Sequence, residues 1–181
     1  YELDDNMLVI SDEQSIDDLA GIMGGERTGV TEKTTRMFLE AAIFDPVSVA
    51  NTGRKLNLNS DARYRFERGL DYNSPESVMH YAAAMVNKIC GGKFSKIVNF
   101  KLEQKNRIIK FDPNIVYKLT GVKIENEVSK SILEKLGFKI VSVDNIWDII
   151  PPSWRPDIDG IADIVEEIIR INGYEKIPAT K

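Results

Sequence analysis

The densest run of chemically capable side chains lies between Trp154 and Gly173, W-R-P-D-I-D-G-I-A-D-I-V-E-E-I-I-R-I-N-G. Five carboxylates fall within eleven positions of this run: Asp157, Asp159, Asp163, Glu166 and Glu167. The last three are spaced i, i+3 and i+4, so a helix places them on one face. Magnesium favours carboxylate oxygens and retained waters. The spacing admits a hard-cation site, and a solvated face on which Glu166 pairs with Arg170 stays open as the alternative.

A second candidate is Glu40, the single acid in the apolar run F-L-E-A-A-I-F from Phe38 to Phe44. Its surroundings predict a carboxylate that is at least partly buried. Such a group either belongs to a binding site or has a structural ion-pair partner, because an unpaired buried charge is costly. Upstream, Gly24 and Gly25 permit close approach to bare backbone, whose amides can donate to a ligand. A plain turn is the alternative for the two glycines.

The charge distribution excludes a uniformly basic nucleic-acid binder, since the net charge is −4. One segment is locally basic, with Asp61 and Glu67 set among Arg54, Lys55, Arg63, Arg65 and Arg68. This segment is either a phosphate-facing edge or a salt-bridged, solvated surface. His80 falls inside a predicted helix with no nucleophile nearby in the sequence, so no catalytic residue is assigned.

Other features bear on the compartment. The lone Cys90 excludes an internal disulfide, which fits the cytoplasm. No apolar run approaches the roughly 18–20 residues that span a bilayer, so no membrane is expected. The chain begins at Tyr1 rather than Met, which suggests a fragment or a processed product.

The elements that would position these residues follow from turn and cap signals. In the first half we expect strands at Met7–Ile10, Leu19–Gly25 and Phe94–Phe100. One helix should begin at Pro46 with Asp45 as its cap. A long helix should run from Ser74, its cap, to Cys90, with Gly91 as its stop.

After the polar stretch Leu102–Asn106 the pattern begins anew, which predicts a linker and a second domain. Expected there are a strand at Arg107–Phe111, a helix from Asp112-Pro113 to Gly121, and a helix from Asn126 to Gly137. In that second helix Val128, Ile132, Leu133 and Leu136 should face inward. A hairpin should join Phe138–Val143 to Ile146–Ile150 through Asp144-Asn145. Asp159 should cap the final helix, whose apolar face would carry Ile161, Ile164, Val165, Ile168 and Ile171.

Four segments together resemble one family, the beta subunit of bacterial-type phenylalanine–tRNA ligase. They are L-A-G-I-M-G-G-E at Leu19–Glu26, F-L-E-A-A-I-F-D-P-V-S at Phe38–Ser48, S-D-A-R-Y-R-F-E-R-G-L-D at Ser60–Asp71, and P-S-W-R-P-D-I followed by D-I-V-E-E-I-I-R-I-N-G-Y. A single G-x-x-G-G turn is common. The set in this order is specific and covers nearly the whole chain.

The resemblance implies an α+β fold in two domains. Residues 1–102 would be the C-terminal half of a mixed α/β tRNA-editing domain, and residues 104–179 the B-five domain, which is winged-helix-like. The family's enzyme is a cytoplasmic tetramer of two alpha and two beta subunits that acts on tRNA(Phe) and consumes ATP. The alpha subunit carries the aminoacylation site, so this fragment alone should not aminoacylate.

The resemblance also implies site residues. Glu40 matches the glutamate that selects tyrosine in hydrolytic editing of tyrosyl-tRNA(Phe), and a carboxylate accepts from a phenolic O–H. Gly24, Gly25, Ser60 and Ala62 match further pocket positions, although a threonine often stands where this chain has Ser60. Magnesium, in a site shared with the alpha subunit, would be held by Asp157, Asp163, Glu166 and Glu167.

Two other classes of protein remain as alternatives. The first is a non-catalytic winged-helix module that binds nucleic acid or a protein. The mixed charge of the helix from Glu125 to Lys135 favours protein contact over nucleic acid. The second is a free-standing editing hydrolase. The resemblance argues against it, because half of the family's editing domain would lie upstream of Tyr1.

Overall fold

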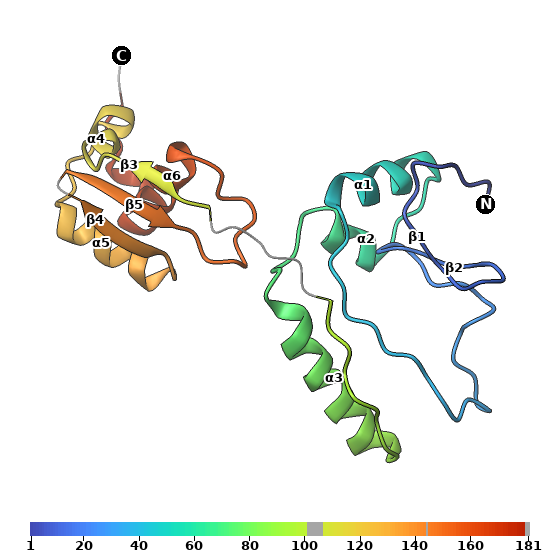
Figure 1. The fold of residues 1–181 in the computed structure, drawn as a ribbon. Coiled ribbons are helices and arrows are strands. Elements are labelled where there is room, and N and C mark those ends of the chain that lie inside the picture. Colours follow the sequence, from blue (N-terminus) through green and yellow to red (C-terminus); the bar gives the residue numbers. More distant parts are fainter. Residues whose placement is uncertain (101–106, 144, 180–181) are drawn as a thin grey trace. The chain divides into compact units, whose positions relative to one another are not determined.

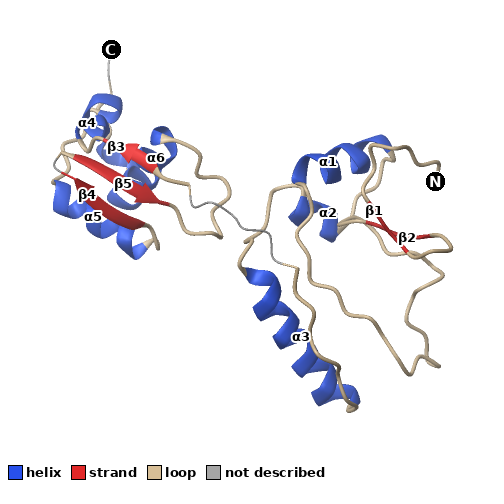
Figure 2. Cartoon of the chain, viewed as in Figure 1, coloured by secondary structure: helices blue, strands red, loops and turns tan. Residues whose placement is uncertain are grey.

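The chain divides into two compact units, Tyr1–Lys101 and Leu102–Lys181 (Figure 1). The computed structural model describes residues 1–100, 107–143 and 145–179, so the expected linker Leu102–Asn106 lies outside the described residues. Each unit combines helices with a small antiparallel sheet (Figure 2). The predicted α+β class is therefore confirmed.

The first unit opens with a two-stranded antiparallel hairpin of β1, Val9–Ser11, and β2, Ile16–Leu19. The strand expected at Leu19–Gly25 is wrong, because the chain turns back as soon as β2 ends. The N–H of Leu19 donates to the carbonyl oxygen of Met23 at 2.9 Å, and that of Met23 donates to Leu19 at 3.1 Å. Gly21 takes a φ of +69° within this turn, a conformation that favours glycine.

Two helices follow. Helix α1, Pro46–Lys55, begins where predicted, and the Asp45 carboxylate accepts from the Ser48 N–H at 2.7 Å. Helix α2, Asp61–Phe66, was not predicted, since six residues are too few to show a helical period. Its cap is Ser60, whose hydroxyl accepts from the Arg63 N–H at 3.1 Å.

Helix α3 has the predicted bounds, Ser74–Cys90, and Gly91 follows it with a φ of +72°. Its cap position is Asn73 rather than Ser74, because Ser74 is already helical and its hydroxyl donates to the Asp71 carbonyl oxygen. The strand expected at Phe94–Phe100 is also wrong. Residues 94–100 pair with no strand among the described residues, and Phe100 is 92% exposed. An apolar run without a neighbouring strand cannot form a ladder.

The core of the first unit is small. Leu19, Ile22 and Val49 are buried, and Phe44 and Phe66 pack against them with ring centroids 5.1 Å apart. The turn after β2, the first half of α1 and the end of α2 are thereby held together around one apolar centre.

The second unit contains a three-stranded antiparallel sheet in the order β3-β5-β4. Its strands are β3, Ile109–Phe111, β4, Lys139–Val143, and β5, Ile146–Ile150. The predicted hairpin is confirmed by the register from Lys139 opposite Ile150 to Val143 opposite Ile146. Asp144 of its turn lies outside the described residues.

Helices α4, Asn114–Thr120, α5, Asn126–Lys135, and α6, Ile161–Asn172, pack with this sheet, and a 3-10 turn, η1, spans Tyr174–Lys176. Gly121 ends α4 in the left-handed conformation, as predicted. Ile132 and Leu133 of α5 are buried as expected, whereas Val128 is 45% exposed. The buried apolar residues of α6 are Ile164, Val165, Ile168 and Ile169, while Ile161 and Ile171 are exposed.

The structure describes no helix with both the length and the apolar character that a membrane crossing requires. The likeness of the second unit to a winged helix stays a prediction.

Candidate functional site

A cavity of about 540 Å³ in the first unit brings Gly24, Glu40 and Ala62 together. This volume falls in the range of small-molecule sites. The walls are mostly apolar, with lining residues that include Ile10, Ile22, Phe44, Phe66, Leu70 and Val78. The lining residues come from β1 and β2, the turn after β2, the irregular run before α1, α2, the segment between α2 and α3, and the first part of α3. An apolar cavity with few polar groups can hold a ring and read its substituents.

Glu40 lies at this cavity but is exposed, contrary to the partial burial that its apolar neighbours predicted. The run Phe38–Phe44 forms neither a strand nor a helix, so its side chains are not sorted into a buried face. The pKa of Glu40 is nevertheless raised above its usual value. Partial desolvation of the carboxylate is the larger cause, and the negative charge of Asp18 adds to it.

The two predicted glycines have different roles. Gly24 lines the cavity, and a methyl group there would meet only the Asp18 carboxylate at 3.5 Å, an ordinary contact. The backbone leaves no room for a side chain at Gly25, because a Cβ there would overlap the carbonyl oxygen of Asp17. The N–H of Gly25 donates to Asp18 Oδ1 at 2.9 Å. Gly25 therefore packs the turn against β2, and Gly24 is the glycine whose backbone faces the cavity.

This difference predicts opposite outcomes for two substitutions. Gly25→Ala should destabilise the chain by about 1–3 kcal/mol, because the methyl group forces the backbone of β2 and the turn apart. Gly24→Ala should change stability by less than about 0.5 kcal/mol, since nothing is displaced. Urea unfolding of the two variants beside wild type is the measurement. Equal stabilities would show that the turn yields to the added methyl group.

Ser60 and Ala62 flank the start of α2. Ala62 lines the cavity. The Ser60 hydroxyl donates to the Ile22 carbonyl oxygen at 2.6 Å and also caps α2, and Ser60 does not line the cavity with the others. Its hydroxyl ties the turn after β2 to α2. The structure thus gives Ser60 a supporting contact, and its place in the pocket stays a prediction.

The sequence did not predict two of the cavity residues, Asp18 and Gly21. Asp18 stands in an acidic pair, Asp17-Asp18, that looks like ordinary surface, and no spacing links it to Glu40. Gly21 lines the cavity as well, and a Cβ there would meet Phe44 and Phe66 at 3.1 Å. The available signal for Gly21 was its place three residues before Gly24-Gly25.

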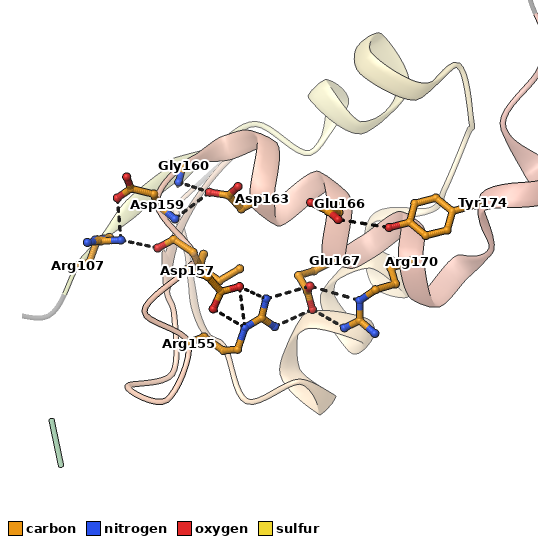
Figure 3. A network of polar contacts seen from close by, with 11 residues as sticks. Arg107, Arg155, Asp157, Asp159, Gly160, Asp163, Glu166, Glu167, Arg170 and Tyr174 are labelled. Carbon is orange, nitrogen blue, oxygen red and sulfur yellow. Dashed lines mark hydrogen bonds and ion pairs between the residues drawn. The ribbon is translucent and has the colours of Figure 1, made fainter. Parts of the chain in front are cut away.

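At the other candidate site, the start of α6 differs from the prediction. Asp159 does not cap the helix, because Gly160 occupies the cap position. Instead, the Asp163 carboxylate reaches back and accepts from the N–H groups of Asp159 and Gly160, each at 2.8 Å (Figure 3). Asp159 pairs with Arg107 at 2.8 Å. Asp163 therefore serves the helix terminus, where a carboxylate is stabilised by free backbone amides.

Glu167 is the centre of an ion-pair network (Figure 3). It is buried, at 5% exposure, and it pairs with Arg155 at 3.0 Å and with Arg170 at 2.6 Å. Arg155 also binds Asp157 through two nitrogens, at 2.8 and 2.6 Å. The guanidinium of Arg155 lowers the pKa of both carboxyl groups, with Arg170 contributing at Glu167. Arg170 thus pairs with Glu167, not with Glu166 as the surface alternative assumed.

The four predicted magnesium ligands do not fit an ion as they are placed here. Within the described residues no three His, Cys, Asp or Glu side chains converge as a metal site. Asp157 and Glu167 are neutralised by Arg155, and Asp163 is turned to the helix terminus. Glu166 accepts from the Tyr174 hydroxyl at 3.5 Å. The oxygen donors suit magnesium, but their directions do not.

The basic segment is a salt-bridged surface in large part. Arg63 pairs with Glu67 at 3.0 Å, and Arg68 shares that carboxylate at the same distance. Arg68 also lies over the ring of Tyr64, 3.7 Å from its centroid. Lys55 is paired with Asp4. These partners favour the structural alternative over a phosphate-facing edge.

Comparison with known proteins places both units. The B3/4 domain family matches residues 1–91, and the tRNA synthetase B5 domain family matches residues 109–174. The chain is 46% identical to the phenylalanine–tRNA ligase beta subunit of Paramagnetospirillum magneticum, with 99% of this chain and 23% of that protein covered. Against the beta subunit of Bradyrhizobium diazoefficiens the identity is 43%, with the same shares covered.

A third beta subunit, from Mesorhizobium japonicum, is 41% identical over 98% of this chain and 22% of its own length. The chain thus spans less than a quarter of the length of these relatives. Both domain families and the identity along nearly the whole chain agree with the four segments that carried the resemblance. The chain therefore belongs to the phenylalanine–tRNA ligase beta subunit family, of which it carries the B3/4 and B5 domains.

Proposed function

We propose that this chain serves as part of a phenylalanine–tRNA ligase and that its first unit contributes to hydrolytic editing of tyrosyl-tRNA(Phe). The supporting observation is the cavity that combines Glu40 with apolar walls and the open backbone at Gly24. A ring can lie among Phe44, Phe66 and Val78, and Glu40 is the polar group that can mark the presence of a hydroxyl.

The physical need for such a site is clear. A pocket that accepts phenylalanine rejects tyrosine by only about a hundredfold, because the two differ by one added hydroxyl. A second site must recognise that hydroxyl rather than exclude it. The Glu40 carboxylate is an acceptor for a phenolic O–H and gains no such bond from phenylalanine. Its raised pKa means that its accepting, ionised form is lost at a higher pH than for a free glutamate.

Filling the cavity tests this function. Ala62→Leu should slow hydrolysis of tyrosyl-tRNA(Phe) by the complete ligase about tenfold, since overfilling a site costs roughly 1–3 kcal/mol. Phenylalanine charging should be unchanged. The measurement is release of labelled tyrosine from preformed tyrosyl-tRNA(Phe), with phenylalanyl-tRNA(Phe) as the parallel substrate. Wild-type hydrolysis by the filled variant would contradict a ring-binding role for the cavity.

The wider setting follows from the same proposal. The partners would be tRNA(Phe) and an alpha subunit that carries the ATP-dependent aminoacylation site, in a cytoplasmic tetramer of two alpha and two beta subunits. Residues 1–102 would form the editing half-domain and residues 104–179 the B-five domain. This chain alone would not aminoacylate, because the proposal assigns the aminoacylation site to the alpha subunit.

Magnesium binding by Asp157, Asp163, Glu166 and Glu167 is proposed only for the assembled enzyme, with further ligands from the alpha subunit. The arginine pairs described above would have to open first, so the isolated chain should bind magnesium weakly. Titration calorimetry of the chain with magnesium chloride should give no micromolar site. Micromolar binding would show that the four acids converge without a partner.

A further inference from the structure

Asp18 occupies a particular place in the hairpin. It lies on β2 opposite Ile10, and both residues line the cavity that holds Glu40. Successive side chains of a strand point to opposite faces. Accordingly, the neighbouring Asp17 pairs with Arg27, away from the cavity lining, while Asp18 lines the cavity.

The Asp18 carboxylate holds the turn that presents Gly24. Its Oδ1 accepts from the Gly25 N–H at 2.9 Å, in a partly buried bond that spans seven residues. Two backbone bonds between Leu19 and Met23 fix the base of the same turn. Beyond these backbone bonds, the position of Gly24 at the cavity depends on this Asp18 bond and on the bond from the Ser60 hydroxyl to the Ile22 carbonyl oxygen. Loss of the Asp18 bond would leave the Gly25 N–H without this acceptor.

Asp18 also sets the charge of the cavity. Among all the residues that line the cavity, Asp18 and Glu40 are the two with ionisable side chains. No cationic side chain in that lining offsets them. After desolvation, the charge of Asp18 is the second cause that raises the pKa of Glu40.

We propose that Asp18 is a positioning residue of this pocket, which holds Gly24 against the substrate and places a second negative charge beside Glu40. The proposal rests on the editing function proposed above. Asp18 touches Gly25 and acts on the substrate through the turn and through Glu40, not by direct chemistry.

Two substitutions separate its roles. Asp18→Ala in the complete ligase should slow tyrosyl-tRNA(Phe) hydrolysis between about twofold and tenfold, the worth of one hydrogen bond. Asp18→Asn keeps an oxygen for the Gly25 N–H and should restore most of that rate. Both variants should shift the acid limb of the rate–pH profile to lower pH, because the pKa of Glu40 falls when the neighbouring charge is removed. A purely structural role would not move that limb.

Asp17→Asn is the matched control, since it removes an adjacent carboxylate outside the cavity, and it should leave rate and profile unchanged. Glu40→Ala, assayed in parallel, separates this inference from the editing function. If Glu40→Ala loses hydrolysis while both Asp18 variants match wild type in rate and pH profile, the role of Asp18 is overturned and editing stands. If Glu40→Ala also keeps full hydrolysis, the editing function falls and the role of Asp18 falls with it.

Discussion

Replacing Glu40 by alanine in the complete ligase is expected to slow hydrolysis of tyrosyl-tRNA(Phe) by about tenfold to a hundredfold. The reason is the loss of one charge-assisted hydrogen bond to the phenolic O–H, worth roughly 1.5–3 kcal/mol. Phenylalanine charging should persist, because the proposal places amino-acid activation at a separate site on the alpha subunit. Deacylation of preformed tyrosyl-tRNA(Phe) and phenylalanine charging, measured on the same preparation, give the two readouts.

The controls follow from the chain itself. Glu32→Ala removes an exposed acid of the same irregular segment that does not line the cavity, and it should behave as wild type. Glu40→Gln keeps an acceptor oxygen without the charge and should fall between wild type and alanine. Unchanged clearance of tyrosyl-tRNA(Phe) by Glu40→Ala would remove Glu40 from the site.

The second large effect concerns the stability of the second unit. Glu167→Gln should destabilise it by about 2–3 kcal/mol at neutral pH, because a buried carboxylate that joins Arg155 and Arg170 loses its charge. Both tryptophans, Trp147 and Trp154, belong to this unit, so urea unfolding followed by tryptophan fluorescence reports on it. Glu166→Gln is the matched control. Glu166 is exposed, and its variant should change stability by less than about 0.5 kcal/mol.

The same network predicts a pH dependence. The pKa of Glu167 is lowered in the folded chain from its usual 4.5, chiefly by Arg155. Its stabilising contribution is therefore complete above about pH 4.5 and is lost as the pH falls through the lower, folded pKa. Wild type should lose its advantage over Glu167→Gln in that acidic range. A gap between the two that stays constant to low pH would contradict the ion-pair account.

Much of the local structure follows from the sequence, because the signals are themselves local. Pro46 and Asp45 mark the start of α1, and Gly121 marks the end of α4. The β4–β5 hairpin is also marked by two apolar runs around a turn. The wrong strand at Phe94–Phe100 has the opposite cause, since strand formation requires a partner that local sequence does not specify.

Four segments in order were enough to predict the family, and the resemblance they carry pointed to Gly24, Glu40 and Ala62, which meet at one cavity. The groups that act on these residues became visible in the fold. Asp18 reaches the cavity because β2 pairs with β1 and the chain then turns, and Gly25 is glycine because the Asp17 carbonyl approaches it. Likewise, helical spacing puts Asp163, Glu166 and Glu167 on one face. The charge of Glu167 is nevertheless paired with Arg155, which lies twelve residues earlier in the chain. Partners brought by the fold from outside an element are invisible to the spacing within it.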